Sequence, residues 1–208
     1  IVTLTMPCFG TTDRTRDNAT KLGELLGTTF RRVDIGEAVM QHFADIGHDP
    51  SDHSTTYENC QARERTQVLM DIANKNGGLV IGTGDLSELA LGWCTYNGDH
   101  MSMYAVNCSI PKTLVRHLTH YVSDLNRESN PELSAVLDDV LATPVSPELL
   151  PTTEDGQMTH FTEDLVGPYE LHDFFLYYAI RCAFPPKKVF RLAEYVFNGE
   201  YDHDTILK

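Results

Sequence analysis

The sequence has 208 residues, a hydrophobic content of 41% and a formal net charge of −14. A chain of this length can bury one good core, but its negative charge opposes general binding to nucleic acid or to an anionic membrane, because both partners need a positive field. No apolar run approaches the length of a membrane-spanning helix. The five cysteines are widely spread and form no C-x-x-C pair. This usage is typical of buried thiols in a reducing compartment, so we expect a cytoplasmic protein.

The first 108 residues alternate between β-rich runs and helical patterns. The β-rich runs are residues 1–6, 28–35, 79–82 and 104–107, and the helical patterns are residues 12–26, 35–47, 57–74 and 87–91. Alternating short strands and helices favour a parallel sheet that helices cover on both faces. Such sheets bind ligands beyond the carboxyl ends of their strands.

The chain is predicted to be mostly helical from residue 109 onward. Ser109 can cap a helix with Pro111 in its first turn. The apolar positions of this helix share one face: Leu114, Val115, Leu118, Tyr121, Val122 and Leu125. We therefore divide the chain into an α/β sheet part, residues 1–108, and a mostly helical part, residues 109–208.

Further helical patterns begin after pairs of residues that contain proline. They are residues 131–140, 169–184 and 187–199. Residues 142–164 show no apolar periodicity, so we expect a long loop there. Phe174, Phe175 and Tyr178 share a helical stripe, which indicates core packing rather than a platform for base stacking.

The helix at residues 57–74 has a polar face that is one candidate binding surface. Asn59, Arg63 and Gln67 are spaced i, i+4 and i+8 and so share this face. An arginine beside amide side chains suits a phosphate or a ribose. The same pattern is typical of a solvated helix face with intrahelical ion pairs, and spacing alone favours that interpretation.

The stretch GTGDLSELALGW, residues 82–93, is a second candidate site. Two glycines bring backbone N–H groups close to a ligand, and Thr83 offers a hydroxyl at the end of a strand. Asp85 and Glu88 are suitable ligands for Mg²⁺. They also match a capping box, with Asp85 as N-cap and Glu88 three residues later. The two interpretations are compatible.

Other patterns carry less information. The loop HDPSDH, residues 48–53, contains metal-ligand residue types, but a loop fixes no coordination geometry, so the pattern is weak evidence for a metal. The signatures of Ser-His-Asp and Cys-His hydrolases are absent.

Three blocks in the same order, ENCQARER, GTGDLSELALGWCTYNGDHMSMYAVNCSIPKTLV and EDLVGPYELHDFFLYY, together resemble the synthetase domain of NAD synthetases, particularly the glutamine-dependent type. The resemblance implies a three-layer α/β/α parallel sheet of the Rossmann-like adenine nucleotide alpha-hydrolase-like fold, with a helical C-terminal part. It implies a ligase that makes NAD from deamido-NAD (nicotinate adenine dinucleotide), ATP and ammonia through an acyl-adenylate, with Mg²⁺.

The same resemblance implies roles for individual residues. Glu88 and Lys112 are the implied catalytic residues, with Glu88 at the dinucleotide and metal centre and Lys112 neutralising ATP phosphate charge. The ATP contacts are Thr83, Lys112 and Thr162. The deamido-NAD contacts are Asn59, Arg63, Glu88, Trp93, Cys94, Thr95, Tyr96 and Asp99. The central expectation is that Arg63, Thr83, Glu88 and Lys112 converge on one polar pocket.

The sequence also departs from the family pattern. We find neither the pyrophosphate-binding loop S-G-G-x-D-S nor the downstream F-K-R-S type segment, and no nitrilase-like glutaminase domain. We therefore expect a fragment that is inactive alone, with a glutaminase domain in the full-length protein, and a homo-oligomer. The loop TYNGDH is one residue shorter than in many relatives, which leaves the register of residues 97–99 open.

Two other functions stay open at this point. One is another ATP pyrophosphatase of the same fold, such as a GMP synthetase, although such enzymes are not expected to carry the GWCTY and GPYELHDFF blocks. The other is a non-catalytic dinucleotide-binding or oligomerisation module.

Overall fold

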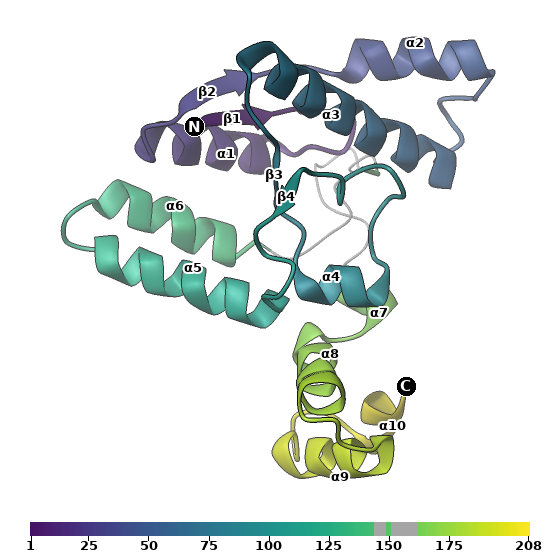
Figure 1. Cartoon of the computed structure of the whole chain (residues 1–208), viewed down its shortest axis with the longest axis vertical. Helices are drawn as coiled ribbons and strands as arrows, with labels where there is room; N and C mark the ends of the chain where they lie inside the picture. The colour runs from purple at the N-terminus through teal and green to yellow at the C-terminus, as the bar shows by residue number, and fades with distance from the viewer. Residues whose placement is uncertain (144–148, 151–161) are drawn as a thin grey trace.

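The computed structural model describes residues 1–143, 149–150 and 162–208, and Figure 1 shows how its elements are arranged. The strands are β1 (Val2–Thr5), β2 (Thr29–Arg32), β3 (Ile81–Gly82) and β4 (Tyr104–Ala105). The first helices are α1 (Asp13–Leu25), α2 (Gly36–Ile46), α3 (Thr55–Asn76) and α4 (Leu86–Leu91). They are followed by α5 (Lys112–Asn126), α6 (Pro131–Leu141), α7 (Thr162–Val166), α8 (Tyr169–Leu176), a π-helical segment η1 (Tyr177–Arg181), α9 (Pro186–Val196) and α10 (His203–Leu207).

The strands of the described residues form two parallel pairs. β1 pairs with β2 along its whole length, with Val2 opposite Thr29, and β3 pairs with β4, with Ile81 opposite Tyr104. The predicted mixed α/β class with parallel strands is confirmed. Within the described residues, however, the two pairs do not join into one sheet. β3 and β4 are shorter than predicted, and Ile81 and Tyr104 remain more than half exposed, so little packing stabilises an extended pair there.

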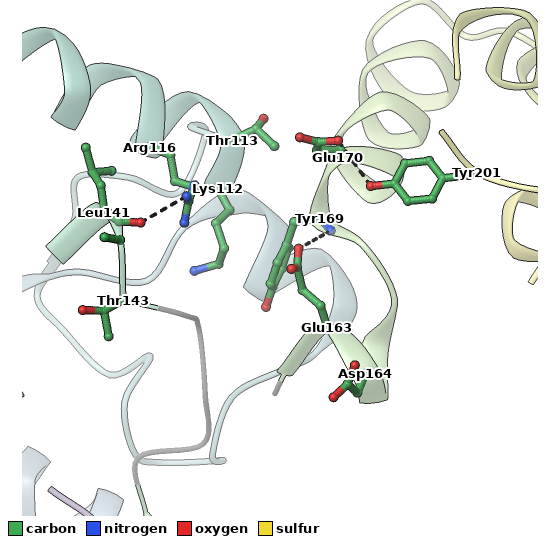
Figure 2. Close-up of a pocket in the computed structure, with 11 residues that line it drawn as sticks. Lys112, Thr113, Arg116, Leu141, Thr143, Glu163, Asp164, Tyr169, Glu170 and Tyr201 are labelled. Atoms are coloured by element: carbon green, nitrogen blue, oxygen red, sulfur yellow. Dashed lines mark hydrogen bonds between the residues drawn. The ribbon is translucent and has the colours of Figure 1, made fainter. Parts of the chain in front are cut away.

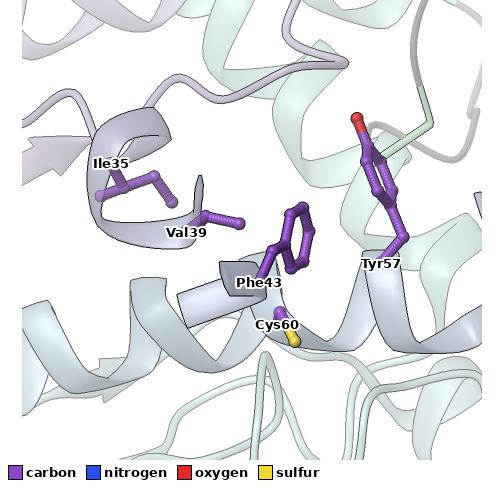
Figure 3. Close-up of a cluster of buried hydrophobic side chains, with 5 residues drawn as sticks. All are labelled: Ile35, Val39, Phe43, Tyr57 and Cys60. Carbon is purple, nitrogen blue, oxygen red and sulfur yellow. The ribbon is translucent and has the colours of Figure 1, made fainter. Parts of the chain in front are cut away.

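The apolar core of the first half lies between α2 and α3, and Figure 3 shows its buried side chains. These side chains are Ile35, Val39, Phe43, Tyr57 and Cys60. Phe43 is fully buried, and its ring centroid lies 5.4 Å from that of Tyr57. This cluster fixes the orientation of α3, which carries the polar face predicted to bind a ligand.

The histidines of the HDPSDH loop pack against this core. The His48 ring lies 4.8 Å from the Phe43 ring, and the His53 ring lies 4.8 Å from the Tyr57 ring. Across the described residues there is no group of three or more His, Cys, Asp or Glu side chains placed to hold a metal ion. The loop histidines therefore contribute aromatic packing.

α5 and α6 form a helical hairpin that packs through polar groups. The buried Ser123 hydroxyl donates to Asp138 Oδ1 at 2.6 Å and lies 2.9 Å from the Ser134 hydroxyl. The apolar stripe predicted on α5 is largely exposed: Leu114, Leu118, Tyr121, Val122 and Leu125 are 39% to 61% exposed. The prediction of Ser109 as N-cap is wrong, because α5 begins after Pro111 and its first N–H groups bond to distant side chains.

The C-terminal helices form a lobe at the end of the molecule opposite α2 and α3 (Figure 1). α8, α9 and α10 pack around Leu171, Ala193 and Ile206. Phe174 and Phe175 pack against this cluster, and the ring of Phe174 lies 4.6 Å from that of Tyr178, which confirms the predicted core stripe.

The predicted loop at residues 142–164 lies mostly outside the described residues. Its last three residues are helical, because α7 begins at Thr162. The sequence prediction therefore placed the end of this loop too late.

The cysteines differ in how far they are exposed to solvent. All five cysteines are free; Cys60 is buried as expected, whereas Cys108 is exposed in a turn after β4, which corrects the expectation of buried thiols. No helix in the part of the chain described above is long and apolar enough to cross a membrane.

Candidate functional site

Asp85 and Glu88 form a capping box at the start of α4. Asp85 Oδ1 accepts the backbone N–H of Glu88 at 2.9 Å, and Glu88 Oε2 accepts the backbone N–H of Asp85 at 3.3 Å. The predicted capping box is confirmed. Just upstream, Gly82 packs so tightly that an added Cβ would overlap the Ser102 hydroxyl. The capping box therefore places both carboxylates in the first turn of α4, beyond the end of β3.

Lys112, the first residue of α5, places its ammonium between these two carboxylates. Lys112 Nζ lies 2.8 Å from Asp85 Oδ2 and 2.8 Å from Glu88 Oε1. Burial lowers the pKa of Lys112, but the hydrogen bonds and the charge attraction of the two carboxylates together outweigh burial and raise this pKa above its ordinary value. Lys112 therefore stays charged at neutral pH. We call Asp85, Glu88 and Lys112 the carboxylate–lysine cluster.

Buried hydrogen bonds hold the N-terminus of α5 in place. Ser87 Oγ accepts the backbone N–H of Lys112 at 2.8 Å, and Asp173 Oδ2 accepts the backbone N–H of Thr113 at 2.8 Å. The Ser87 hydroxyl in turn donates to Asp173 Oδ1. These contacts join α4, α5 and α8, and they satisfy N–H groups that every helix leaves free at its first turn. The position of Lys112 thus depends on three helices.

A cavity of about 630 Å³ lies beside Lys112, and Figure 2 shows the side chains around it. α5 contributes Lys112, Thr113 and Arg116, and the remaining lining residues are Leu141, Ala142, Thr143, Glu163, Asp164, Tyr169, Glu170 and Tyr201. Cationic side chains therefore come from α5 and carboxylates from α7 and α8. One wall of the cavity is therefore basic and another is acidic.

Tyr169 separates Lys112 from the acidic wall of the cavity. Its ring centroid lies 5.1 Å from Lys112 Nζ, and its backbone N–H donates to Glu163 Oε1 at 3.0 Å. The Tyr169 hydroxyl is buried and finds no hydrogen-bond partner among the residues that the structure describes. Burial raises the pKa of Tyr169 to about 12, so the phenol is neutral. The ring shields the lysine from water on this side.

The loop that follows α4 lies against the polar face of α3. Arg63 Nε donates to the Tyr96 carbonyl at 3.2 Å, and Asp99 Oδ1 accepts the Thr95 N–H at 2.7 Å. Gly98 sits so close to α3 that an added Cβ would lie 3.2 Å from Ala62 Cβ. The structure therefore brings Arg63 together with the loop containing Thr95, Tyr96 and Asp99.

Cys94 belongs to this loop and follows closely on the C-terminal end of α4. Burial raises the pKa of the Cys94 thiol, and the nearby carboxylates of Asp99 and Glu88 raise it further. Cys94 is therefore a neutral thiol rather than a nucleophile. Carboxylates of the loop and of the carboxylate–lysine cluster thus both act on this thiol.

The other predicted site residues differ in their exposure to solvent. Trp93 and Tyr96 are 39% and 74% exposed, Thr83 is exposed, and Asn59 is partly buried. Thr162 is only 2% exposed and does not line the cavity. Of the four side chains expected to converge on one pocket, Lys112 lines this cavity, whereas Arg63, Thr83 and Glu88 do not. Direct contact is found between Glu88 and Lys112.

Sequence reasoning missed Ser87 and Asp173 as supports of the site. Both side chains are buried, at 0% and 8% exposure. One signal was available: an aspartate inside the aromatic segment YELHDFFLYY has no local reason to be buried unless it meets hydrogen-bond donors. The identity of those donors depends on the packing of α4 and α5, which no local pattern encodes.

Comparison with known proteins identifies similar sequences. The family described as NAD synthase matches residues 1–180. The glutamine-dependent NAD(+) synthetase of Mycobacterium bovis is 44% identical over 203 residues, which are 95% of this chain and 30% of that protein. The chain therefore spans about 30% of the length of this curated relative.

Solved structures are similar as well. The glutamine-dependent NAD+ synthetase of Acinetobacter baumannii in complex with ADP matches 98% of this chain and 33% of its own, with 25% identity and a TM-score of 0.56. A glutamine-dependent NAD(+) synthetase of Cytophaga hutchinsonii matches 99% of this chain and 31% of its own, with a TM-score of 0.68. Its identity is 18%, so this likeness concerns the fold alone.

Proposed function

Because the chain belongs to the NAD synthase family, we propose that it serves the ATP-dependent amidation of deamido-NAD to NAD, as the synthetase part of a glutamine-dependent C–N ligase. The identity of 44% to a glutamine-dependent NAD(+) synthetase supports this proposal. The structural observation that carries it is the carboxylate–lysine cluster beside a cavity of about 630 Å³. Such a cluster provides a largely enclosed cation and a pair of carboxylates at one point, and such groups assist adenylyl transfer between two anionic substrates.

The proposed chemistry explains why a cation is needed. A carboxylate does not react with ammonia, so a nicotinate oxygen first attacks the α-phosphorus of ATP, pyrophosphate leaves, and an acyl-adenylate forms. Ammonia then attacks the carbonyl carbon, AMP leaves, and the nitrogen releases a proton. The first step brings two anions together. The Lys112 ammonium offsets phosphate charge during this step, because a positioned cation stabilises charge best in a site with little water.

The carboxylate pair fits a magnesium ion. In the structure the Lys112 ammonium lies between Asp85 and Glu88, so the pair already accommodates positive charge. Glu88 is the better candidate ligand, because its side chain is 29% exposed and that of Asp85 only 5%. Mg²⁺ takes one or two carboxylates and keeps phosphate oxygens and water as its other ligands. When bound, the ion supplies neutralising charge at the phosphates.

The loop after α4 and the polar face of α3 are the proposed deamido-NAD site. Asn59 and Arg63 come from α3, and the loop contributes Trp93, Cys94, Thr95, Tyr96 and Asp99. The exposed indole of Trp93 suits stacking on a nicotinate ring. The bond from Arg63 to the Tyr96 carbonyl supports this assignment, since it keeps the arginine beside the loop. For the polar face of α3 we therefore propose substrate binding, instead of the solvated helix face that spacing alone favours.

ATP is proposed to contact Lys112, with Thr83 at the end of β3 as a further contact. Thr83 is exposed and is available for such a contact. Thr162 is the weaker candidate, because it is buried at 2% exposure. A relative solved in complex with ADP supports adenine nucleotide binding.

The finer architecture and the wider context are also part of the proposal. We infer a three-layer α/β/α sheet of the adenine nucleotide alpha-hydrolase-like type, supported by the parallel pairing of β1 with β2 and of β3 with β4. We further propose a glutaminase domain as the source of ammonia, a homo-oligomeric assembly and a cytoplasmic location. The exposed apolar stripe of α5 is compatible with assembly.

Ligand-dependent thermal stability of the purified protein tests this function. Deamido-NAD, ATP with Mg²⁺, NAD and xanthosine monophosphate are added separately, because a ligand that binds only the folded state raises the melting temperature. At 100 times its Kd, a ligand stabilises the fold by about 2.7 kcal/mol. We expect deamido-NAD and ATP with Mg²⁺ each to raise the melting temperature.

The other ligands separate the rival functions. A response to xanthosine monophosphate in place of deamido-NAD would identify a GMP synthetase-like enzyme. A response to NAD without any response to ATP would identify a non-catalytic dinucleotide-binding module. Either result contradicts the proposed reaction.

A further inference from the structure

Asp85 is the most enclosed member of the carboxylate–lysine cluster. The sequence motif gives it the role of a helix cap, and the proposed chemistry names Glu88 rather than Asp85 as the better metal ligand. The Asp85 side chain is 5% exposed, compared with 15% for Lys112 and 29% for Glu88. Its two oxygens have separate partners: Oδ1 accepts the Glu88 N–H, and Oδ2 accepts the Lys112 ammonium. The carboxylate is therefore held at both ends and cannot rotate without losing one bond.

The two carboxylates differ in their freedom to leave the lysine. Glu88 is bound through Oε1 to Lys112 and through a longer contact of 3.3 Å to the Asp85 N–H. A glutamate that turns toward a metal ion gives up its bond to the ammonium. Asp85 has no such alternative, because its capping bond to the helix fixes its orientation. Asp85 is the partner that can keep Lys112 when Glu88 leaves it.

Lysine needs such a partner to act at a defined point. Its side chain is flexible and carries about 2 kcal/mol of rotamer entropy. The backbone of Lys112 is fixed by the Ser87 hydroxyl, and the Tyr169 ring covers one side of the ammonium. The only charged anchors of Nζ among the described residues are Asp85 and Glu88.

We propose that Asp85 is a positioning residue that acts through Lys112: it keeps the ammonium beside the cavity while Glu88 is engaged by a divalent cation. This inference rests on the proposed function, in which Lys112 meets the phosphates of ATP. It separates the two carboxylates of the cluster into a fixed anchor for the lysine and a mobile ligand.

The variant Asp85→Asn tests the anchor with little change in shape. Asparagine caps helices as well as aspartate does, so the bond to the Glu88 N–H is kept while the charge that holds Lys112 is lost. Asp202→Asn is the matched control, because Asp202 caps α10 through a 2.7 Å bond from the Thr205 N–H and has no ion-pair partner among the described residues. If Asp85→Asn fails to fold, Asp85→Ser supplies another capping residue without charge.

The main readout is the rate at which an amine-reactive reagent labels Lys112, measured by mass spectrometry between pH 8 and pH 10. We expect Asp85→Asn to raise this rate several-fold, because the ammonium then keeps Glu88 as its single charged anchor among the described residues and is freer to meet the reagent. Mg²⁺ is then added alone. It should leave labelling nearly unchanged in the wild type, where Asp85 retains the lysine, and should raise it further in Asp85→Asn.

Three outcomes overturn the inference: unchanged labelling in Asp85→Asn, an equal increase in Asp202→Asn, or release of Lys112 by Mg²⁺ in the wild type. The ATP response of the wild type is measured alongside. If ATP with Mg²⁺ does not stabilise the wild type, the proposed function fails, whereas the labelling result still decides whether Asp85 anchors Lys112.

Discussion

Replacing Lys112 with methionine should destabilise the fold through the carboxylates that it leaves behind. Methionine keeps most of the volume of the lysine stem but removes the charge. Asp85 Oδ2 and Glu88 Oε1 each lie 2.8 Å from the same nitrogen, so they cannot be farther apart than twice that distance. Two unit charges at about 5 Å repel by about 3 kcal/mol at an effective dielectric constant of about 20.

Solvent at Glu88 reduces this repulsion, because the Glu88 side chain is 29% exposed. We therefore expect Lys112→Met to lower the free energy of unfolding by about 2 kcal/mol at pH 7, less than the 3–5 kcal/mol measured for fully buried pairs that lose one partner. The double variant Lys112→Met with Glu88→Gln removes one of the two charges, so no repulsion remains and most of the loss should be recovered. Urea denaturation measures both values.

The pH dependence of this difference follows from the raised pKa of Lys112. A lysine whose pKa is higher in the folded state stabilises the fold fully below its unfolded pKa of about 10.4, and this stabilisation disappears as the pH rises through the folded pKa. The gap between wild type and Lys112→Met should thus be constant from pH 7 to pH 9 and close only above about pH 10.4. A gap that is absent at pH 7, or that closes below pH 9, would refute this reasoning.

Three further predictions concern other parts of the structure. Gly98→Ala should reduce the thermal stabilisation by deamido-NAD but not that by ATP with Mg²⁺, because the new Cβ would lie 2.9 Å from Thr95 and 3.2 Å from Ala62. Equal loss of both thermal shifts would contradict a separate dinucleotide site. Phe43→Ala should lower the free energy of unfolding, measured in urea, by about 3–5 kcal/mol, since Phe43 is fully buried. A loss below about 1 kcal/mol would show that Phe43 is not packed in the core between α2 and α3. Hydrogen bonds from Arg14 and Asn18 lower the pKa of Asp139 to about 2, so Asp139→Asn should be less stable than the wild type at pH 7. That difference should shrink as the pH falls from about 4 to 2, and a constant difference in thermal denaturation across this range would contradict it.

Local patterns predicted the elements of the fold well, because helix spacing and caps are properties of neighbouring residues. The capping box of Asp85 and Glu88 is visible as D-x-x-E at the start of an apolar helical run, and the structure confirms it. The cap of α5 was missed for the opposite reason. Its N–H groups are satisfied by Ser87 and Asp173, which come from other helices.

The arrangement of the site was harder to predict than its residue types. The pairing of Lys112 with Glu88 joins residues on different helices, and only the packing of α4 against α5 brings them together. The resemblance to a known family selected both residues but not Asp85 as the second anchor of the lysine. The apolar stripe of α5 shows the same limit, because periodicity marks an apolar face without showing whether anything covers it.

We propose that Glu88 and Lys112 form the nucleotide-binding centre of this protein. A crystal structure of the protein with a non-hydrolysable ATP analogue and Mn²⁺ in place of Mg²⁺ tests this proposal, because manganese is located by its anomalous scattering. We expect a manganese peak at the Glu88 carboxylate, with Lys112 Nζ bonded to both Asp85 and a phosphate oxygen. A nucleotide bound elsewhere, with the bonds from Lys112 to both carboxylates intact, would contradict it.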